Sequence, residues 1–104
     1  MLFQDITDTF FDGLMISTHP EFNHEKVFYY EDSKVGLKSL VAIHDSSRGP
    51  AIGGCRFKSY SDFESGLNDV LRLSRGMTEK NNVAQILFGG GKAIIFADKP
   101  KSNE

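Results

Sequence analysis

The clearest hydrophobic pattern in the chain runs from Ser61 to Ala84, where residues recur at the spacing of one helix face. The stripe consists of Phe63, Leu67, Val70, Leu71, Ser74 and Met77. Ser61 followed three residues later by Glu64 has the spacing of a capping box, which predicts the helix start. Because glycine costs up to about 1 kcal/mol in a helix interior, we expect a bend or break near Gly76.

A second helix is predicted at the N-terminus, over Leu2–Leu14, because four apolar residues there follow the i, i+3/i+4 spacing. These residues are Phe3, Ile6, Phe10 and Leu14. The segment ends before Pro20, since proline disfavours helical conformation in the residue that precedes it. The polar tail Lys99–Glu104 is expected to be frayed.

Four segments are typical of β-strands because they are rich in β-branched, aromatic and other apolar residues. They are Val27–Tyr30, Leu37–His44, Ala51–Phe57 and Ala93–Phe96. Gly53 and Gly54 interrupt the third strand, and Gly89–Gly91 precedes the fourth. The resulting order α-β-β-β-α-β predicts an α/β fold in which helices sandwich a mixed β-sheet. At 104 residues, the chain is expected to form a single domain.

Composition excludes several functional classes. A formal net charge of −2 and a pI near 5.9 argue against a nucleic-acid partner or an anionic membrane surface. The sequence has neither a membrane-length apolar run nor a signal peptide, so we expect a soluble, cytoplasmic chain. Cys55 is the single cysteine, is expected to be buried, and cannot form an internal disulfide. The scattered residues His19, His24 and His44 lack metal-ligand spacing, so no metal site is predicted.

The glycine triplet before Lys92 invites comparison with a phosphate-binding loop, but the pattern does not match. Such a loop needs a glycine five residues before the Gly-Lys pair and a hydroxyl residue after it. Ile86 and Ala93 occupy those positions, and the glycines lead into a strand instead of a helix. Three glycines would instead allow positive φ and a close approach of the backbone to a ligand.

Two lysines carry chemistry that the pattern alone leaves open. Lys92 heads a buried strand, where burial or a neighbouring cation would depress a lysine pKa and make the amine a usable base. The alternative is a surface lysine beside a turn. Lys80 lies at the edge of the helical stripe, where its ammonium either reaches water or holds a substrate carboxylate. Gly53 and Gly54 mark either a β-bulge or a place where a ligand nears the backbone.

Taken together, three segments resemble the N-terminal domain of the glutamate/leucine/phenylalanine/valine dehydrogenase family. They are Gly53-Gly54-Cys55-Arg56, Asp69-Val70-Leu71-Arg72-Leu73-Ser74-Arg75-Gly76-Met77-Thr78-Glu79-Lys80 and Gly89-Gly90-Gly91-Lys92-Ala93-Ile94-Ile95. The segment His24-Glu25-Lys26-Val27 and the turn Gly49-Pro50-Ala51 resemble most the leucine and phenylalanine dehydrogenase branch. The similarity extends from about His24 to Asp98.

The resemblance implies NAD(P)-dependent oxidative deamination of an L-amino acid of the leucine, valine or phenylalanine type to its 2-oxo acid and ammonia. It implies that Lys80 binds the substrate α-carboxylate and that Lys92 is catalytic, assisting water addition and proton transfers around an imine. Met77 and the backbone of Gly53 and Gly54 would line the substrate pocket. A homodimer or higher homo-oligomer is the implied assembly.

The chain also departs from the family pattern. A Gly-x-Gly-x-x-Gly sequence after a strand is absent, so we expect no NAD-binding Rossmann domain and no tight binding of NAD or NADP by this chain. Residues 1–104 would then be a partial domain that is inactive alone. Asp98 is not assigned the role of the family's proton-transfer aspartate, and Cys55 and Phe57 replace residues common in the family. The alternative is a non-catalytic dimerisation or assembly module derived from such an enzyme.

Overall fold

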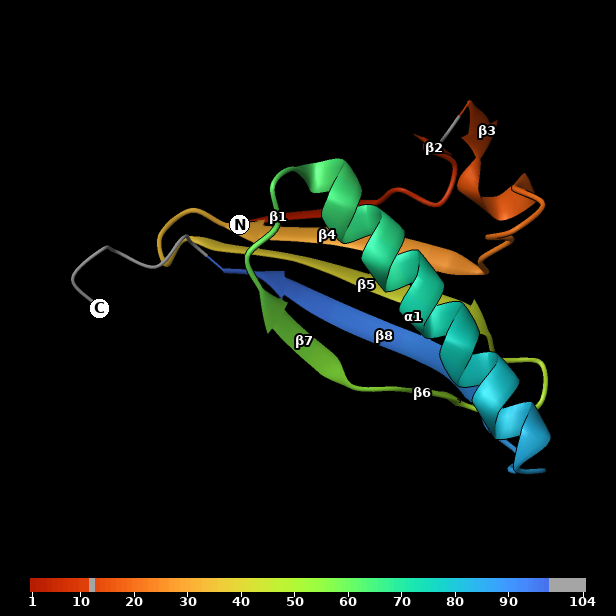
Figure 1. The fold of residues 1–104 in the computed structure, drawn as a ribbon. Helices are drawn as coiled ribbons and strands as arrows, with labels where there is room; N and C mark the ends of the chain where they lie inside the picture. Colours follow the sequence, from red (N-terminus) through yellow and green to blue (C-terminus); the bar gives the residue numbers. More distant parts are fainter. Residues whose placement is uncertain (12, 98–104) are drawn as a thin grey trace.

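The computed structural model describes residues 1–11 and 13–97 as one mixed β-sheet crossed by a long helix (Figure 1). The sheet and the helix consist of β1 (Leu2–Asp5), β4 (Lys26–Asp32), β5 (Leu37–Asp45), β6 (Ala51–Ile52), β7 (Cys55–Lys58), α1 (Phe63–Val83) and β8 (Gly89–Phe96). The strand order is β1-β4-β5-β8-β6, and β7 also pairs with β8. Strands β6 and β7 run parallel to β8, whereas the other pairs in this sheet are antiparallel. The predicted mixed α/β fold is confirmed.

Helix α1 covers 21 residues and begins one residue later than the capping box predicted. Asp62 is the N-cap, and its carboxylate accepts a 2.7 Å hydrogen bond from the backbone N–H of Ser65. The helix continues through Gly76 without the expected break. It ends at Val83, after which Gln85 adopts a positive φ of 58° and the N–H of Ile86 bonds back to the Asn81 carbonyl at 2.9 Å.

The hydrophobic core lies between α1 and the sheet. Val27, Leu40, Ala42 and Ile94 project from β4, β5 and β8 toward the helix, and each is fully buried. They pack with the helix residues Leu67, Val70 and Leu71. Near the start of the helix, a Cβ at Gly66 would overlap the ring of Phe96, so glycine lets this ring approach the helix backbone.

The glycine triplet belongs to strand β8 instead of preceding it. Gly90 and Gly91 pair with Asp45 and Ile43 of β5, and none of the three glycines has a positive φ. Their lack of a side chain serves packing, because a Cβ at Gly90 would overlap the backbone of Thr78 in α1. The expected positive φ is therefore wrong, and a close approach of two protein backbones takes its place.

The N-terminal helix prediction is also wrong. Leu2–Asp5 forms β1, an edge strand paired with β4, in which the ring of Phe3 stacks on that of Phe28 with centroids 5.2 Å apart. Beyond it, β2 (Phe10–Phe11) pairs with β3 (Leu14–Met15), and a 3-10 turn, η1 (Ile16–Thr18), follows. The apolar spacing matched a helix, but pairing with β4 satisfies the backbone of β1 and stacks its aromatic residue.

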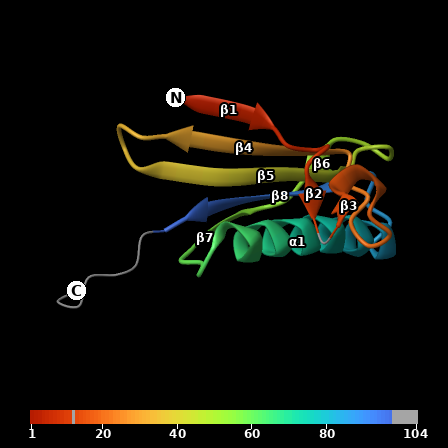
Figure 2. The same cartoon turned by 90° about the horizontal axis from the view of Figure 1, so that it is seen from above.

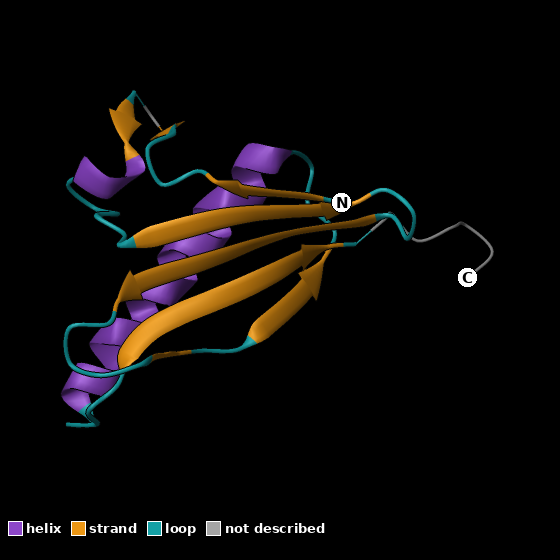
Figure 3. Ribbon diagram, turned by 180° about the vertical axis from the view of Figure 1, so that it is seen from behind, coloured by secondary structure: helices purple, strands orange, loops and turns teal. Residues whose placement is uncertain are grey.

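Only one face of the sheet is covered within the described residues. Figure 2 shows α1 along one side of the strands, and Figure 3 shows the other side open to view. The predicted second helical layer is missing because the segment expected to supply it forms strands. No helix in the described ranges is long and apolar enough to cross a membrane. The predicted frayed tail lies outside the described residues.

Candidate functional site

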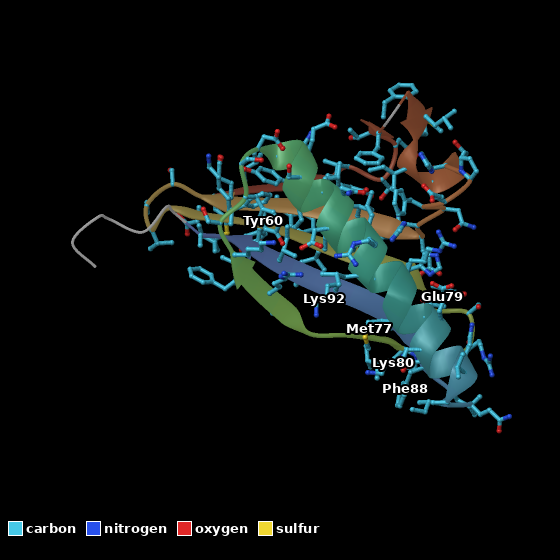
Figure 4. The ribbon with its side chains drawn as sticks, viewed as in Figure 1. Tyr60, Met77, Glu79, Lys80, Phe88 and Lys92 are labelled. Atoms are coloured by element: carbon cyan, nitrogen blue, oxygen red, sulfur yellow. The ribbon has the colours of Figure 1, made fainter. Side chains whose placement is uncertain are left out.

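Lys92 lies on β8 at the point where the strand meets the connection between β6 and β7. Its neighbours along the strand alternate between faces, and both Gly90 and Ile94 face α1, so the Lys92 side chain starts on the helix side. The side chain is half-buried and extends toward the strand edge (Figure 4). Its Nζ lies 3.2 Å from the position that a Cβ of Gly54 would occupy. The ammonium therefore lies directly against the Gly54 backbone.

The two glycines between β6 and β7 allow this arrangement. A Cβ at Gly53 would overlap the carbonyl of Gly91, so a side chain there would separate the connection from β8. The carbonyl of Gly54 accepts a 3.0 Å hydrogen bond from the backbone N–H of Ala93, which holds the connection against the strand. The interrupted strand that the sequence predicted is confirmed, and its interruption lies beside Lys92.

Met77 and Lys80 approach the same edge from the helix. Figure 4 shows both side chains along the flank of α1 that faces β6 and β7, with Phe88 beside them, whereas Glu79 lies on the opposite flank. Met77 is half-buried and Lys80 is exposed in the last turn of the helix. Within residues 1–11 and 13–97, neither Lys80 nor Lys92 forms an ion pair.

A separate hollow of about 380 Å³ opens on the other face of the sheet. Gly53, Gly54 and Lys92 contribute to its lining, but its remaining walls include Val41 and Ala93, which point away from α1. Met77 and Lys80 do not line it. The structure thus gathers the five predicted site residues around one sheet edge, with the lysine side chains on the helix side of that edge.

A pair of histidines that contacts α1 was missed by sequence reasoning. The rings of His24 and His44 lie 4.8 Å apart, although 20 residues separate them in the chain. His24 is buried, and burial lowers its pKa to about 4; burial likewise lowers the pKa of His44. His24 lies in the loop before β4 and His44 on β5, so the two carry no spacing signal and only the fold reveals this pair. In the described ranges, no group of three or more potential ligands is arranged for a metal ion.

Arg56 forms an ion pair with a helix residue, and Cys55 lies on the open face of the sheet. Arg56 lies 3.3 Å from the Asp69 carboxylate, which also accepts hydrogen bonds from Tyr60 and Arg72. Burial raises the Asp69 pKa, but these donors and cations outweigh it and hold the pKa below its usual range. Cys55 is exposed and not buried as expected, because β7 is an edge strand whose odd residues face the uncovered side.

Comparison with known proteins identifies the family. Residues 24–104 match the model of the Glu/Leu/Phe/Val dehydrogenase, dimerisation domain. The chain belongs to this family. The resemblance seen in the sequence is confirmed, including its leucine and phenylalanine dehydrogenase branch. The matched region contains Gly53, Gly54, Met77, Lys80 and Lys92.

Individual relatives of this dehydrogenase-family domain support the same family assignment. The chain is 51% identical over 78 residues to a phenylalanine dehydrogenase of Caldalkalibacillus thermarum, covering 75% of this chain and 21% of that protein. It is 46% identical over 80 residues to a leucine dehydrogenase of Geobacillus stearothermophilus, covering 77% and 22%. The crystal structure of L-tryptophan dehydrogenase from Nostoc punctiforme superposes with a TM-score of 0.76 at 41% identity, covering 86% and 28%. The chain thus spans about a fifth of the length of these sequence relatives.

Proposed function

We propose that this chain is the N-terminal, substrate-binding and dimerisation domain of an NAD(P)-dependent L-amino-acid dehydrogenase. The enzyme would convert an L-amino acid of the leucine, valine or phenylalanine type to its 2-oxo acid and ammonia. Family membership and the names of the relatives support this reaction class. The observation that carries the proposal is the position of Lys92 against Gly54, with Lys80 and Met77 on the same side of the sheet edge.

The two lysines would divide the work. Lys80, exposed and without an acidic partner in the described ranges, would pair its ammonium with the substrate α-carboxylate. Lys92, half-buried against Gly54, would act on the α-carbon side, assisting water addition to an imine and moving protons around it. Met77 and the backbone of Gly53 and Gly54 would form apolar and close-fitting walls, since glycine leaves room for a ligand beside the amine.

The described residues do not fit a dinucleotide. Such cofactors bind where a strand leads through a glycine-rich turn into a helix N-terminus. Here the glycine triplet lies inside β8, its backbone pairs with β5 and β6, and Gly90 packs against α1. NAD or NADP would therefore be held by residues other than those described, and we expect no NADH formation from L-amino acids by the 104-residue chain alone.

A binding experiment tests the proposed substrate site at Lys80 and Lys92. The 104-residue chain is titrated with 4-methyl-2-oxopentanoate, a 2-oxo acid, and backbone amide shifts are followed by NMR. We expect the shifts to gather at Gly53, Gly54 and Met77 and to vanish in Lys80→Met and Lys92→Met. Lys34→Met is the matched control, because Lys34 is an exposed lysine in the turn between β4 and β5. Equal binding by all four proteins would refute the proposed site.

A non-catalytic assembly module is the second candidate, favoured by the uncovered sheet face. Phe3, Val41 and Phe57 on this face are 61%, 38% and 72% exposed. From strand spacing and rise, the six strands of two to nine residues offer about 540 Å², slightly below the lower limit of about 600 Å² per partner for a stable interface. A second copy of this chain would cover it. Sedimentation should show a dimer that Phe57→Lys disrupts and Val83→Lys, at an exposed helix position, leaves intact.

A further inference from the structure

The inner face of α1 changes character halfway along the helix. Leu67, Val70 and Leu71 supply apolar contacts in the first half. The same face then continues with Ser74, Thr78 and Asn81, which are 0%, 5% and 4% exposed. A polar group buried without a hydrogen bond costs free energy, so these residues stabilise the helix–sheet contact less than apolar residues would unless they are hydrogen-bonded. All three are hydrogen-bonded.

Each buried polar residue of this face bonds to a different segment of the chain. Ser74 Oγ lies 2.7 Å from Nε2 of His24, and Thr78 Oγ1 lies 2.8 Å from Nδ1 of His44. Asn81 donates a 3.0 Å hydrogen bond from Nδ2 to the Gly89 carbonyl. No buried side-chain nitrogen or oxygen in the described ranges lacks a partner. Satisfied polar networks fix one relative position, whereas apolar surfaces tolerate sliding.

These anchors lie close to the two lysines along the chain. Thr78 precedes Lys80 by two residues and Asn81 follows it directly. On the strand, Gly89 and Gly90 precede Lys92 by three and two residues. A Cβ at Gly90 would overlap the backbone of Thr78, so helix and strand touch backbone to backbone here. Little chain is left between the contact and either amine to absorb a shift.

We propose that Thr78 and Asn81, through His44 and the Gly89 carbonyl, are positioning residues that set where the Lys80 ammonium stands relative to Lys92. This inference rests on the proposed function for its substrate, a small 2-oxo or amino acid recognised by its carboxylate. The geometric part concerns the protein alone. Without the hydrogen bond to His44, the last turns of α1 shift over β8 and the carboxylate no longer meets Lys80 at the right distance from Lys92.

The experiment compares Thr78→Val, which keeps the shape but loses the hydroxyl, with Thr78→Ser, which keeps the hydroxyl. Tyr60→Phe is the matched control, because Tyr60 makes a 2.5 Å hydrogen bond to Asp69 near the other end of α1. Affinity is measured by NMR titration with 4-methyl-2-oxopentanoate and with its uncharged methyl ester. The yield of Lys80–Lys92 cross-links from a short amine-reactive reagent is measured without any ligand by mass spectrometry.

We expect Thr78→Val to weaken binding of the acid about 10-fold, a loss typical of a misplaced binding group, with no change for the ester. The cross-link yield should change several-fold in Thr78→Val, and Thr78→Ser should restore both readouts. Tyr60→Phe should change neither, even where its melting temperature falls as far. Equal changes in Thr78→Val and Tyr60→Phe, or no change in either, would overturn the positioning role.

The two proposals fail separately. If the wild-type chain does not bind the 2-oxo acid, yet the cross-link yield changes only in Thr78→Val, the proposed function fails and the positioning role stands. If the wild-type chain binds the acid and Thr78→Val neither weakens that binding nor changes the cross-link yield, the positioning role fails and the substrate site stands.

Discussion

The two halves of helix α1 meet the same sheet by different means. In the first half, bulky side chains such as Leu71 lie between helix and strands, and Phe96 fills the space over Gly66. In the second half, the strand has glycines, the helix has small polar residues, and the backbones of Gly90 and Thr78 touch. The first contact buries apolar area; the second makes directional hydrogen bonds.

This difference separates stability from position. Burial of apolar area contributes roughly 25 cal/mol per Å² whatever the exact alignment, so the first half of α1 supplies adhesion. Net hydrogen bonds contribute only about 1 kcal/mol each but demand one geometry. The lysine of the helix, Lys80, lies in the half that is held by geometry. The proposed site at Lys80 and Lys92 would depend on this second, directional half.

The largest expected loss of stability comes from the apolar half. Leu71 is fully buried, and Leu71→Ala leaves a cavity between α1 and the sheet. We expect the free energy of unfolding to fall by about 3 kcal/mol, measured by urea denaturation with circular dichroism. Leu87→Ala is the control, since Leu87 is 69% exposed. Similar losses in both variants would show that the first half does not dominate adhesion.

A methyl group at Gly90 tests the backbone contact of the polar half. The new Cβ meets backbone atoms of Thr78 and Ser74, which cannot rotate away as a flexible side chain can. Gly90→Ala should cost about 2 kcal/mol through overpacking and should shift the NMR signals of residues 77–81. If the signals stay in place and stability is unchanged, helix and strand are farther apart than the structure shows.

Acid should weaken the polar half selectively. Burial lowers the pKa of His24 to about 4, whereas an unfolded histidine titrates near 6.5. The unfolded state therefore binds the proton first, so the His24 contribution is complete above about pH 6.5 and is lost as pH falls toward 4. We expect a loss of about 2 kcal/mol by about pH 5, followed by urea denaturation at several pH values. His24→Gln should flatten this pH dependence; an unchanged slope would contradict the assignment to His24.

The smallest effect has the opposite sign. Gly76 lies on the exposed side of α1, and nothing lies within 4 Å of a Cβ built there. Gly76→Ala should raise the free energy of unfolding by about 0.7 kcal/mol, because alanine loses less backbone entropy than glycine in a helix. Thermal melts of Gly76→Ala and Gly90→Ala measure the change, and we expect the melting temperature to rise in the first variant and fall in the second. A destabilised Gly76→Ala would mean that the helix needs flexibility at this position.

The strands and α1 could be predicted because their side chains carry a local period. The Val27–Tyr30 and Leu37–His44 segments gave strands close to their observed limits, and the break at Gly53-Gly54 separates β6 from β7. The N-terminal residues have a helical period too, but β4 offered an unpaired edge, and pairing there decided the outcome. Local propensity does not report pairing with strand residues that are 23 to 29 positions away along the chain.

The candidate site was predictable in its residues but not in its construction. Lys80 and Lys92 came from the order and spacing of a family pattern, and their place on one side of the sheet edge came from the fold. The glycine triplet has a different role from the predicted one. Gly90 allows the backbone of α1 to approach β8 closely, and none of the three glycines has a positive φ. The His24–His44 pair had no sequence signal, because the loop before β4, strand β5 and helix α1 must come together before those rings meet.

The sequence by itself determined which segments form α1 and the central strands, since period and composition are local properties of the chain. It also determined that Lys80 and Lys92 carry amines, because the chemistry of a side chain is fixed by the residue type. Only the tertiary structure decided that the helix and β8 touch through Thr78 and Gly90, that one sheet face stays uncovered, and that both lysines reach the same edge. These features depend on contacts between residues far apart in sequence, which packing selects and no local pattern encodes.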